Sequence, residues 1–250
     1  MRKPSAMPVR RFDCLDALRG VAIVWMTAYH LCFDLNHFGY LKLDFYADPI
    51  WTWQRTAIVS LFLFTAGLGQ AAAVHQDQGW HRFWWRWAQV AGCALLVTAG
   101  SYAMYPQSFI YFGVLHGMAV MLPIVRLTAG LGSLLWFLGA AAIAMKFIAS
   151  YVHSSWAGAE FLNQNSFNWL GLISRKPITE DFVPLFPWLG VMWWGMAAGT
   201  WALRQRPHWF YLHTGLAGRL LAWLGRWSLS YYLLHQPVLI GLLMAIGALK

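Results

Sequence analysis

Seven long apolar stretches recur along the chain and are separated by short polar or basic connections. They occupy residues 14–35, 55–75, 88–105, 109–127, 131–151, 184–203 and 224–247. A helix needs about 20 consecutive apolar residues to cross the hydrocarbon core of a bilayer, and each stretch is close to that length. The pattern predicts an all-α fold, a polytopic integral membrane bundle of about seven transmembrane helices. We expect residues 1–250 to form a single domain.

The composition also indicates a membrane protein. Hydrophobic residues make up 59% of the 250 residues and charged residues only 11%, which excludes an ordinary soluble domain. The basic start Met1–Lys3, followed by an apolar run, has the outline of a secretory signal. The run contains Asp16 and Arg19, however, and lacks a cleavage site of small residues. We therefore expect this segment to be a first helix that is retained.

Basic residues are distributed unevenly between alternate connections, and this bias predicts the orientation. One side of the membrane is expected to hold Arg2, Lys3, Arg10, Arg11, Arg82, Arg86, Arg126, Arg204, Arg206, Arg219 and Arg226. The other side is expected to hold Lys42, Arg55, Lys146, Arg175, Lys176 and Lys250, together with Asp44, Asp48, Glu160, Glu180 and Asp181. We expect the N-terminus in the cytoplasm and the C-terminus outside. The net charge of +9 is explained by this bias and by lipid headgroup contact, so nucleic-acid binding is not expected.

Three polar side chains share one face of the first apolar stretch. Arg19 and His30 are eleven residues apart, which places them on one helical stripe with an axial separation of about 16 Å. Asp34 follows His30 by four residues, the spacing at which two side chains on a helix meet. Ionisable groups inside a membrane are costly and are therefore candidates for a functional site. A histidine with a carboxylate beside it favours a general base.

A purely structural interpretation of the same residues stays open. In that interpretation Asp16 and Arg19, three residues apart, neutralise each other at the cytoplasmic edge of the membrane. His30 and Asp34 do the same at the external edge. A third interpretation makes His30 and Asp34 the relay of a proton-coupled transporter, although the paired half-repeats of such proteins are lacking.

Histidines and cysteines raise the question of a metal or haem site. His30, His116 and His235 lie within apolar stretches, so an electron carrier with two histidines on a haem iron is an alternative function. No paired histidine spacing is repeated on two helices, which weakens this alternative. The three cysteines are scattered in or beside apolar stretches: Cys14, Cys32 and Cys93. Their spacing is typical of neither zinc nor a disulfide framework, so no metal is expected.

Two further polar residues lie near the external ends of apolar stretches. His116 is expected two turns inside the fourth helix, where ordinary packing is the simpler explanation of a lone histidine. Asp181 precedes Pro184 and Pro187, and prolines are ordinary in a first helical turn. Only the acid therefore needs a functional explanation.

The last apolar stretch contains His235 and Gln236 immediately before Pro237. Because proline cannot donate a backbone hydrogen bond, we expect a kink here and a free backbone carbonyl. Such a break is tolerated in a membrane where it is buried in protein or lines a polar cavity.

These motifs, taken in order, resemble the transmembrane acyltransferase superfamily. Asp16–Gly20, followed by His30 after ten residues beyond Arg19, resembles the first-helix signature of that superfamily. Four later segments resemble blocks of its bacterial branch related to heparan-alpha-glucosaminide N-acetyltransferase: Ser60–Gly67, Phe112–His116, Asp181–Trp188 and Ser228–Pro237. The similarity covers nearly the whole chain.

The resemblance implies an acyl-CoA-dependent acyltransferase. In such an enzyme an acyl group, expected to be acetyl, moves from cytoplasmic acyl-CoA to a hydroxyl or amine of a sugar or glycan on the far side of the membrane. Acetyl-CoA as donor, an extracytoplasmic acceptor and the bilayer are then the partners. The resemblance to the bacterial branch also implies that this bilayer is a bacterial inner membrane. The acceptor stays open between an amino sugar, an envelope glycan and a lipid-linked saccharide, and homo-oligomerisation also stays open.

The resemblance and the helical stripe together imply roles for individual residues. The residues expected to hold the donor are Arg19, with Asp16 beside it, Arg82, Arg86, Arg126 and Arg226. His30 is expected to take a proton from the acceptor, with Asp34 fixing its tautomer. The donors expected for the developing oxyanion are His116, His235 and Gln236. Asp181 is expected to line the acceptor site, and a route through an acetyl-histidine intermediate stays open.

Overall fold

The computed structural model describes residues 11–211 and 215–248, which form helices joined by loops and turns. The eight described α-helices are α1 (Asp13–His37), α2 (Pro49–His75), α3 (Trp80–Met104), α4 (Val114–Leu127), α5 (Leu134–Ser155), α6 (Leu185–Gln205), α7 (Leu216–Arg226) and α8 (Ser228–Ala248). Short 3-10 helices are η1 (Ala129–Leu131), η2 (Ala157–Asn163), η3 (Asn168–Leu170) and η4 (Pro207–Tyr211). The predicted all-α membrane bundle is confirmed. Four basic residues used to predict the orientation lie outside the described residues: Arg2, Lys3, Arg10 and Lys250.

Local sequence signals explain where two of the helices begin. At α2 the Asp48 carboxylate accepts a hydrogen bond from the Ile50 N–H at 2.8 Å, and Pro49 occupies the first helical position, where its missing N–H has no cost. α1 carries Asp13 and Asp16 in its first turn. Carboxylates there interact favourably with the positive end of the helix dipole.

The fourth predicted span differs from the helix in the structure. α4 begins only at Val114 and has 14 residues, so it is about 21 Å long and too short for a hydrocarbon core of about 30 Å. The residues before it are extended because they pair with the segment that leads into α6. Val183 N–H donates to the Phe112 carbonyl at 3.0 Å, and Glu180 N–H donates to the Ser108 carbonyl at 2.9 Å.

The last predicted span, residues 224–247, also differs from the structure, because its first three residues are the end of a separate helix, α7. α7 ends at Arg226 and α8 begins at Ser228. α8 then continues as a helix through Pro237 to its last residue. Three described helices are long and apolar enough to cross a membrane by length and composition: Pro49–His75, Leu134–Ser155 and Ser228–Gly247.

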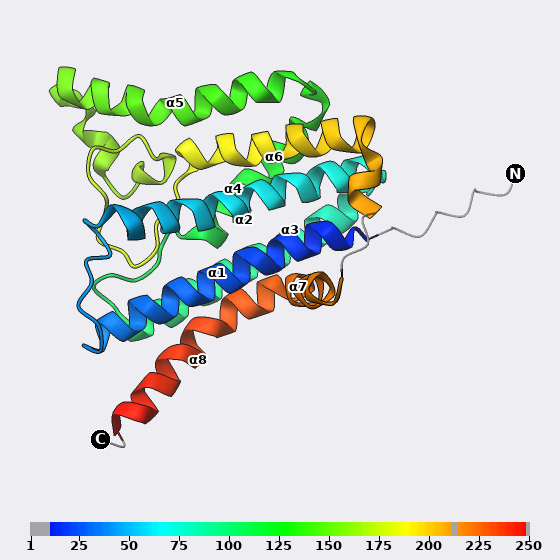
Figure 1. The fold of residues 1–250 in the computed structure, drawn as a ribbon. Coiled ribbons are helices and arrows are strands. Elements are labelled where there is room, and N and C mark those ends of the chain that lie inside the picture. The colour runs from blue at the N-terminus through cyan, green and yellow to red at the C-terminus, as the bar shows by residue number, and fades with distance from the viewer. Residues whose placement is uncertain (1–10, 212–214, 249–250) are drawn as a thin grey trace, which may run out of the picture.

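The long helices run along one direction of the molecule, and α7 lies across them (Figure 1). The start of α1, α7 and η4 gather at one end, which we call the N-terminal end. The connections 38–48, 105–113 and 156–184 gather at the opposite end, which we call the loop end. α1 and α8 are in contact, and their side chains meet between these two ends.

Glycines allow α2 and α6 to approach closely in the centre of the bundle. A Cβ atom on Gly67 would lie 2.1 Å from the Met192 carbonyl oxygen, and one on Gly195 would lie 2.1 Å from that of Phe64. Small residues at helix contacts are how membrane proteins gain packing energy, because lipid tails are as apolar as side chains. Of the two helices, α2 also lines the cavity described below.

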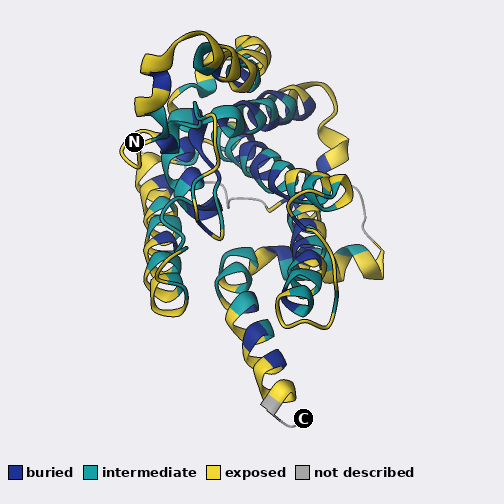
Figure 2. Ribbon diagram, turned by 90° about the vertical axis from the view of Figure 1, so that its left-hand side faces the viewer, coloured by how far each residue is buried: buried dark blue, intermediate teal, exposed yellow. Residues whose placement is uncertain are grey.

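Exposed residues, yellow in Figure 2, lie along the outer faces of the bundle, and many of them are large and apolar. Large exposed examples on α3, α5 and α8 are Leu95, Leu96, Phe137, Phe147, Leu234 and Leu242. A water-soluble protein rarely exposes contiguous apolar surface on this scale. These faces are suited to lipid, as expected for an integral membrane protein.

Candidate active site

Two histidines from opposite ends of the chain meet between α1 and α8. His30 Nδ1 and His235 Nε2 are 2.7 Å apart, and the two rings are nearly parallel, with an interplanar angle of 11°. One turn nearer the N-terminal end, Thr27 Oγ1 and the Tyr231 hydroxyl are 2.9 Å apart. These contacts fix α8 against α1. A direct contact of 2.7 Å also leaves no room for a metal ion between the two nitrogen atoms, since metal–nitrogen bonds alone are about 2.0 Å each.

The backbone of α8 determines which nitrogen atoms of the pair carry hydrogen. His235 Nδ1 lies 2.7 Å from the Tyr232 carbonyl oxygen, which can only accept, so Nδ1 is the donor. In neutral His235 the lone pair is then on Nε2, which accepts a hydrogen bond from His30 Nδ1. Neutral His30 therefore has its own lone pair on Nε2. That atom is the one able to act as a base or a nucleophile.

The predicted pairing of Asp34 with His30 is wrong. Asp34 is buried, but its Oδ1 accepts a hydrogen bond from Gln236 Nε2 at 2.7 Å, and its Oδ2 has no partner among the described residues. The four-residue spacing on α1 permits the predicted contact. The neighbouring residues His235 and Gln236 of α8 instead supply a separate partner for each side chain.

His116 lies away from this pair, in the first turn of α4 rather than two turns inside a helix. Its Nδ1 accepts a hydrogen bond from the Gly113 N–H at 3.3 Å, and its Nε2 is 2.9 Å from Thr98 Oγ1. Both ring nitrogens are therefore occupied. The Thr98 hydroxyl in turn donates to the Ile110 carbonyl, so the imidazole joins α3 to the start of α4.

Asp181 reaches from the loop before α6 towards α8. Its Oδ2 accepts hydrogen bonds from the Val114 N–H at 2.8 Å and from the Tyr232 hydroxyl at 3.4 Å. Burial raises the pKa of the Asp181 carboxyl above its ordinary value, and the Val114 N–H partly offsets this effect. A Cβ atom on Gly113 would lie 2.4 Å from Oδ2, so glycine is needed there for the carboxylate to fit.

A cavity of about 550 Å³ opens at the N-terminal end and penetrates the bundle. We call it the arginine cavity because its lining includes Arg11, Arg19, Arg82, Arg86, Arg126 and Arg226. Its α2 wall extends from Gln76 to Phe62, a depth of about 21 Å at 1.5 Å per residue. Tyr232 also lines it, and this residue is one turn from His235 in the same helix.

Positive charge in the arginine cavity exceeds the nearby negative charge. Arg19 pairs with Asp16 at 2.8 Å, and Arg226 pairs with Asp13 at 2.8 Å. Arg86 is within electrostatic range of three further arginines and of Asp16, and it has no ion pair among the described residues. Like charges gathered in a concave, partly desolvated site favour an anionic ligand.

Tyr232 is the site residue that the sequence interpretation missed. Its hydroxyl bonds to Asp181, its carbonyl orients His235, and its ring closes the arginine cavity. The sequence feature that could have identified Tyr232 is its position three residues before His235, because residues with this spacing share a helix face.

Comparison with known proteins identifies the family. No curated protein and no solved structure matches the chain. Residues 11–237 match the family model described as heparan-alpha-glucosaminide N-acetyltransferase, catalytic. The matched segment contains the histidine pair and every lining arginine of the arginine cavity. The chain therefore belongs to the heparan-alpha-glucosaminide N-acetyltransferase catalytic family, and its general function is that of a membrane acetyltransferase.

Proposed function

We propose that the protein moves an acetyl group from cytoplasmic acetyl-CoA to a hydroxyl or amine of a sugar or glycan on the other side of the membrane. One observation carries this proposal. The arginine cavity runs from a cationic opening at the N-terminal end to Tyr232, one turn from the His30–His235 pair. Acetyl-CoA has a matching form, with an anionic nucleotide at one end and a thin arm that ends in the thioester.

The arginines at the opening are suited to the phosphates of the donor. Charge-assisted hydrogen bonds between guanidinium and phosphate are stronger than neutral ones and are often bidentate. Arg19 is about 16 Å from His30 along α1 by helical rise, so one helix connects the cationic opening to the reacting end. The basic-residue bias independently favours a cytoplasmic N-terminal end.

His30 is the proposed general base, with His235 as the residue that orients it. His30 Nε2 takes the proton of the acceptor O–H or N–H as the acceptor oxygen or nitrogen attacks the thioester carbonyl carbon. The C–S bond then breaks, and the imidazolium returns the proton to the CoA thiolate. His235 Nε2 accepts from His30 Nδ1 throughout and stabilises the imidazolium. The same lone pair would be the nucleophile in a route through acetyl-histidine.

Asp34 and Gln236 are proposed as positioning residues. In this proposal Asp34 does not act directly on His30. Their hydrogen bond lies beside the histidine pair and joins the same two helices. Gln236 Oε1 and Asp34 Oδ2 are both buried without a partner among the described residues. These two oxygens are therefore available to accept from N–H or O–H groups of an acceptor.

Arg86→Gln is expected to weaken acetyl-CoA binding about tenfold, because one charge-assisted contact to a phosphate is lost. Arg86 is preferred to Arg19 for this test because its removal leaves no buried carboxylate unpaired. The binding of acetyl-pantetheine, which lacks the nucleotide phosphates, should not change. Isothermal titration of both donors in nanodiscs measures the difference.

The matched control is Arg204→Gln, which removes an arginine at the same end that does not line the arginine cavity. It should leave both affinities unchanged. Equal losses for the two donors in Arg86→Gln would mean that this arginine has a structural role only.

A further inference from the structure

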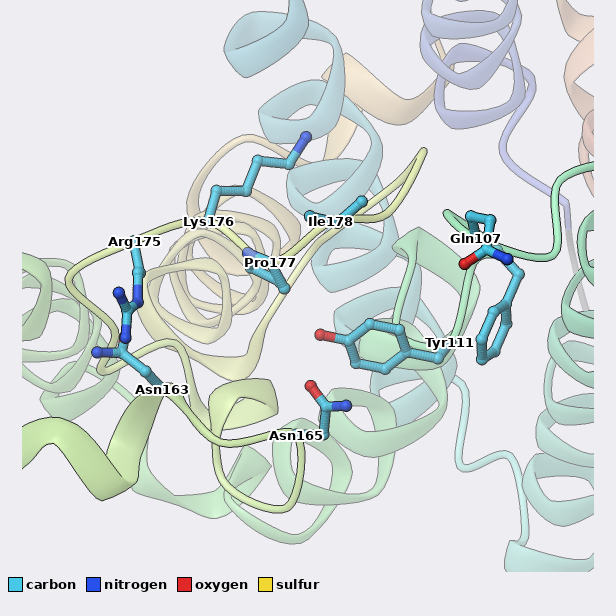
Figure 3. Close-up of a pocket in the computed structure, with 9 residues that line it drawn as sticks. Gln107, Tyr111, Asn163, Asn165, Arg175, Lys176, Pro177 and Ile178 are labelled. Atoms are coloured by element: carbon cyan, nitrogen blue, oxygen red, sulfur yellow. The ribbon is translucent and has the colours of Figure 1, made fainter.

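A second cavity, of about 680 Å³, lies at the loop end of the molecule (Figure 3). We call it the loop cavity. It shares no lining residue with the arginine cavity. Its walls come from residues 107–111, residues 163–165 and residues 175–178, so it is built by the connections after α3 and α5. Neither the family match nor the proposed donor site accounts for it.

An extended segment forms one wall of the loop cavity. Gln107, Phe109 and Tyr111 all line it, and alternate residues of an extended chain face the same side. The segment is held by the strand-like chain beside it, because Thr179 Oγ1 donates to the Phe109 carbonyl at 2.9 Å. The Phe109 and Tyr111 ring centroids are 6.1 Å apart. The wall therefore offers two adjacent aromatic rings with an amide beside them.

A fully buried asparagine arranges the polar groups of the loop cavity. Asn168 has no exposed surface, and its Nδ2 donates to the Tyr111 hydroxyl oxygen at 2.7 Å and to Asn165 Oδ1 at 3.3 Å. Both partners act as acceptors in these bonds, so the Tyr111 O–H and the Asn165 NH2 group remain available as donors. Figure 3 shows the Tyr111 hydroxyl and the Asn165 amide near each other in the pocket. A buried polar group that orients two lining groups is typical of a binding site with fixed geometry.

The wall of the loop cavity is connected to the histidine pair through Asp181 and Tyr232. Tyr111 is three residues before Val114, whose N–H binds Asp181. Asp181 accepts from the Tyr232 hydroxyl, and the Tyr232 carbonyl binds His235. Three residues of backbone and three hydrogen bonds therefore link the loop cavity to His235, although the cavity is separate from the histidine pair.

We propose that the loop cavity binds one saccharide unit of the acceptor, adjacent to the unit that receives the acetyl group. This inference rests on the proposed function. Aromatic rings bind the apolar face of a sugar ring, while amide and hydroxyl donors bind its hydroxyl groups. An acceptor that fills both places has at least two saccharide units.

Acceptor titrations test this assignment. The probes are glucosamine and two glucosamine-terminated tetrasaccharides, one of hexosamines only and one alternating with uronic acids. Direct binding and acetyl transfer are both measured with the full chain in nanodiscs. Wild-type protein should bind at least one tetrasaccharide about tenfold more tightly than glucosamine. Asn165→Ala and Tyr111→Phe should each raise the KM of that tetrasaccharide about tenfold and leave the KM of glucosamine and the affinity for acetyl-CoA unchanged.

Ser166→Ala is the matched control, because Ser166 is in the same loop and does not line the loop cavity. It should change neither KM. The assignment is overturned if neither tetrasaccharide binds, if glucosamine binds as tightly, or if both lining variants behave as wild type. A protein that binds a tetrasaccharide here and transfers no acetyl group would retain this assignment and contradict the proposed function instead.

Discussion

His30→Ala is expected to lower acetyl transfer by about two to four orders of magnitude, the range typical of a positioned general base. The variant should remain folded, because it removes a polar group from inside the membrane, where such groups are costly. It should also bind acetyl-CoA normally, since the arginine cavity is not lined by His30. Initial rates of transfer, thermal unfolding and donor titration on the same preparation separate these effects.

His75→Ala is a suitable control, because it removes a histidine that is the last residue of α2 and does not line the arginine cavity. Its transfer rate should equal that of wild type. Normal transfer by a folded His30→Ala protein would refute the role of His30 as base and nucleophile alike.

His235→Phe is expected to lower transfer about a hundredfold, because His30 Nδ1 loses the acceptor that fixes its tautomer. The double variant with His30→Ala should be little slower than His30→Ala alone, since His235 acts through the His30 ring. His235→Gln should recover part of the rate because its amide oxygen can accept from Nδ1–H. Asp34→Asn should have a smaller effect than His235→Phe, since Asp34 does not bond to His30.

Initial rates for these variants at saturating acetyl-CoA provide the measurement. If His235→Gln and His235→Phe lose activity equally, the hydrogen bond to His30 is not the reason for the loss. Additive losses in the double variant would show that the two histidines act independently.

Helix periodicity in the sequence was sufficient to predict the bundle but not all of its boundaries. Residues 109–113 are apolar, and their composition alone predicts that they belong to the span that follows. They become extended because residues 180–183, about seventy positions later, offer backbone partners. The local sequence pattern carries no information about such a long-range pairing. The α7–α8 junction was missed because Leu224, Gly225 and Trp227 continue the apolar composition of α8, and only Trp227 separates the two helices.

The candidate site, too, could be predicted only in part from the sequence. The arginines expected to hold a donor do line one cavity, because α1, α3, α4 and α7 each bring their basic residues to the N-terminal end. The partner of His30 could not be predicted from α1 alone. Asp34 has suitable spacing, but the partner of His30 is set by how α8 packs, which brings His235 within 2.7 Å. Contacts between helices distant in sequence depend on tertiary packing, and the sequence pattern shows only the groups available.

Transfer across a sealed membrane tests the central claim most directly. The protein is reconstituted into vesicles, and the fraction with the N-terminal end outward is determined with an impermeant protease acting on an N-terminal tag. Radiolabelled acetyl-CoA is added outside, and a glucosamine-terminated tetrasaccharide is trapped inside. We expect labelled tetrasaccharide in the lumen, in proportion to the outward-facing fraction of the protein. With His30→Ala we expect no labelled tetrasaccharide. Label appearing only when donor and acceptor are on the same side of the membrane would contradict the central claim.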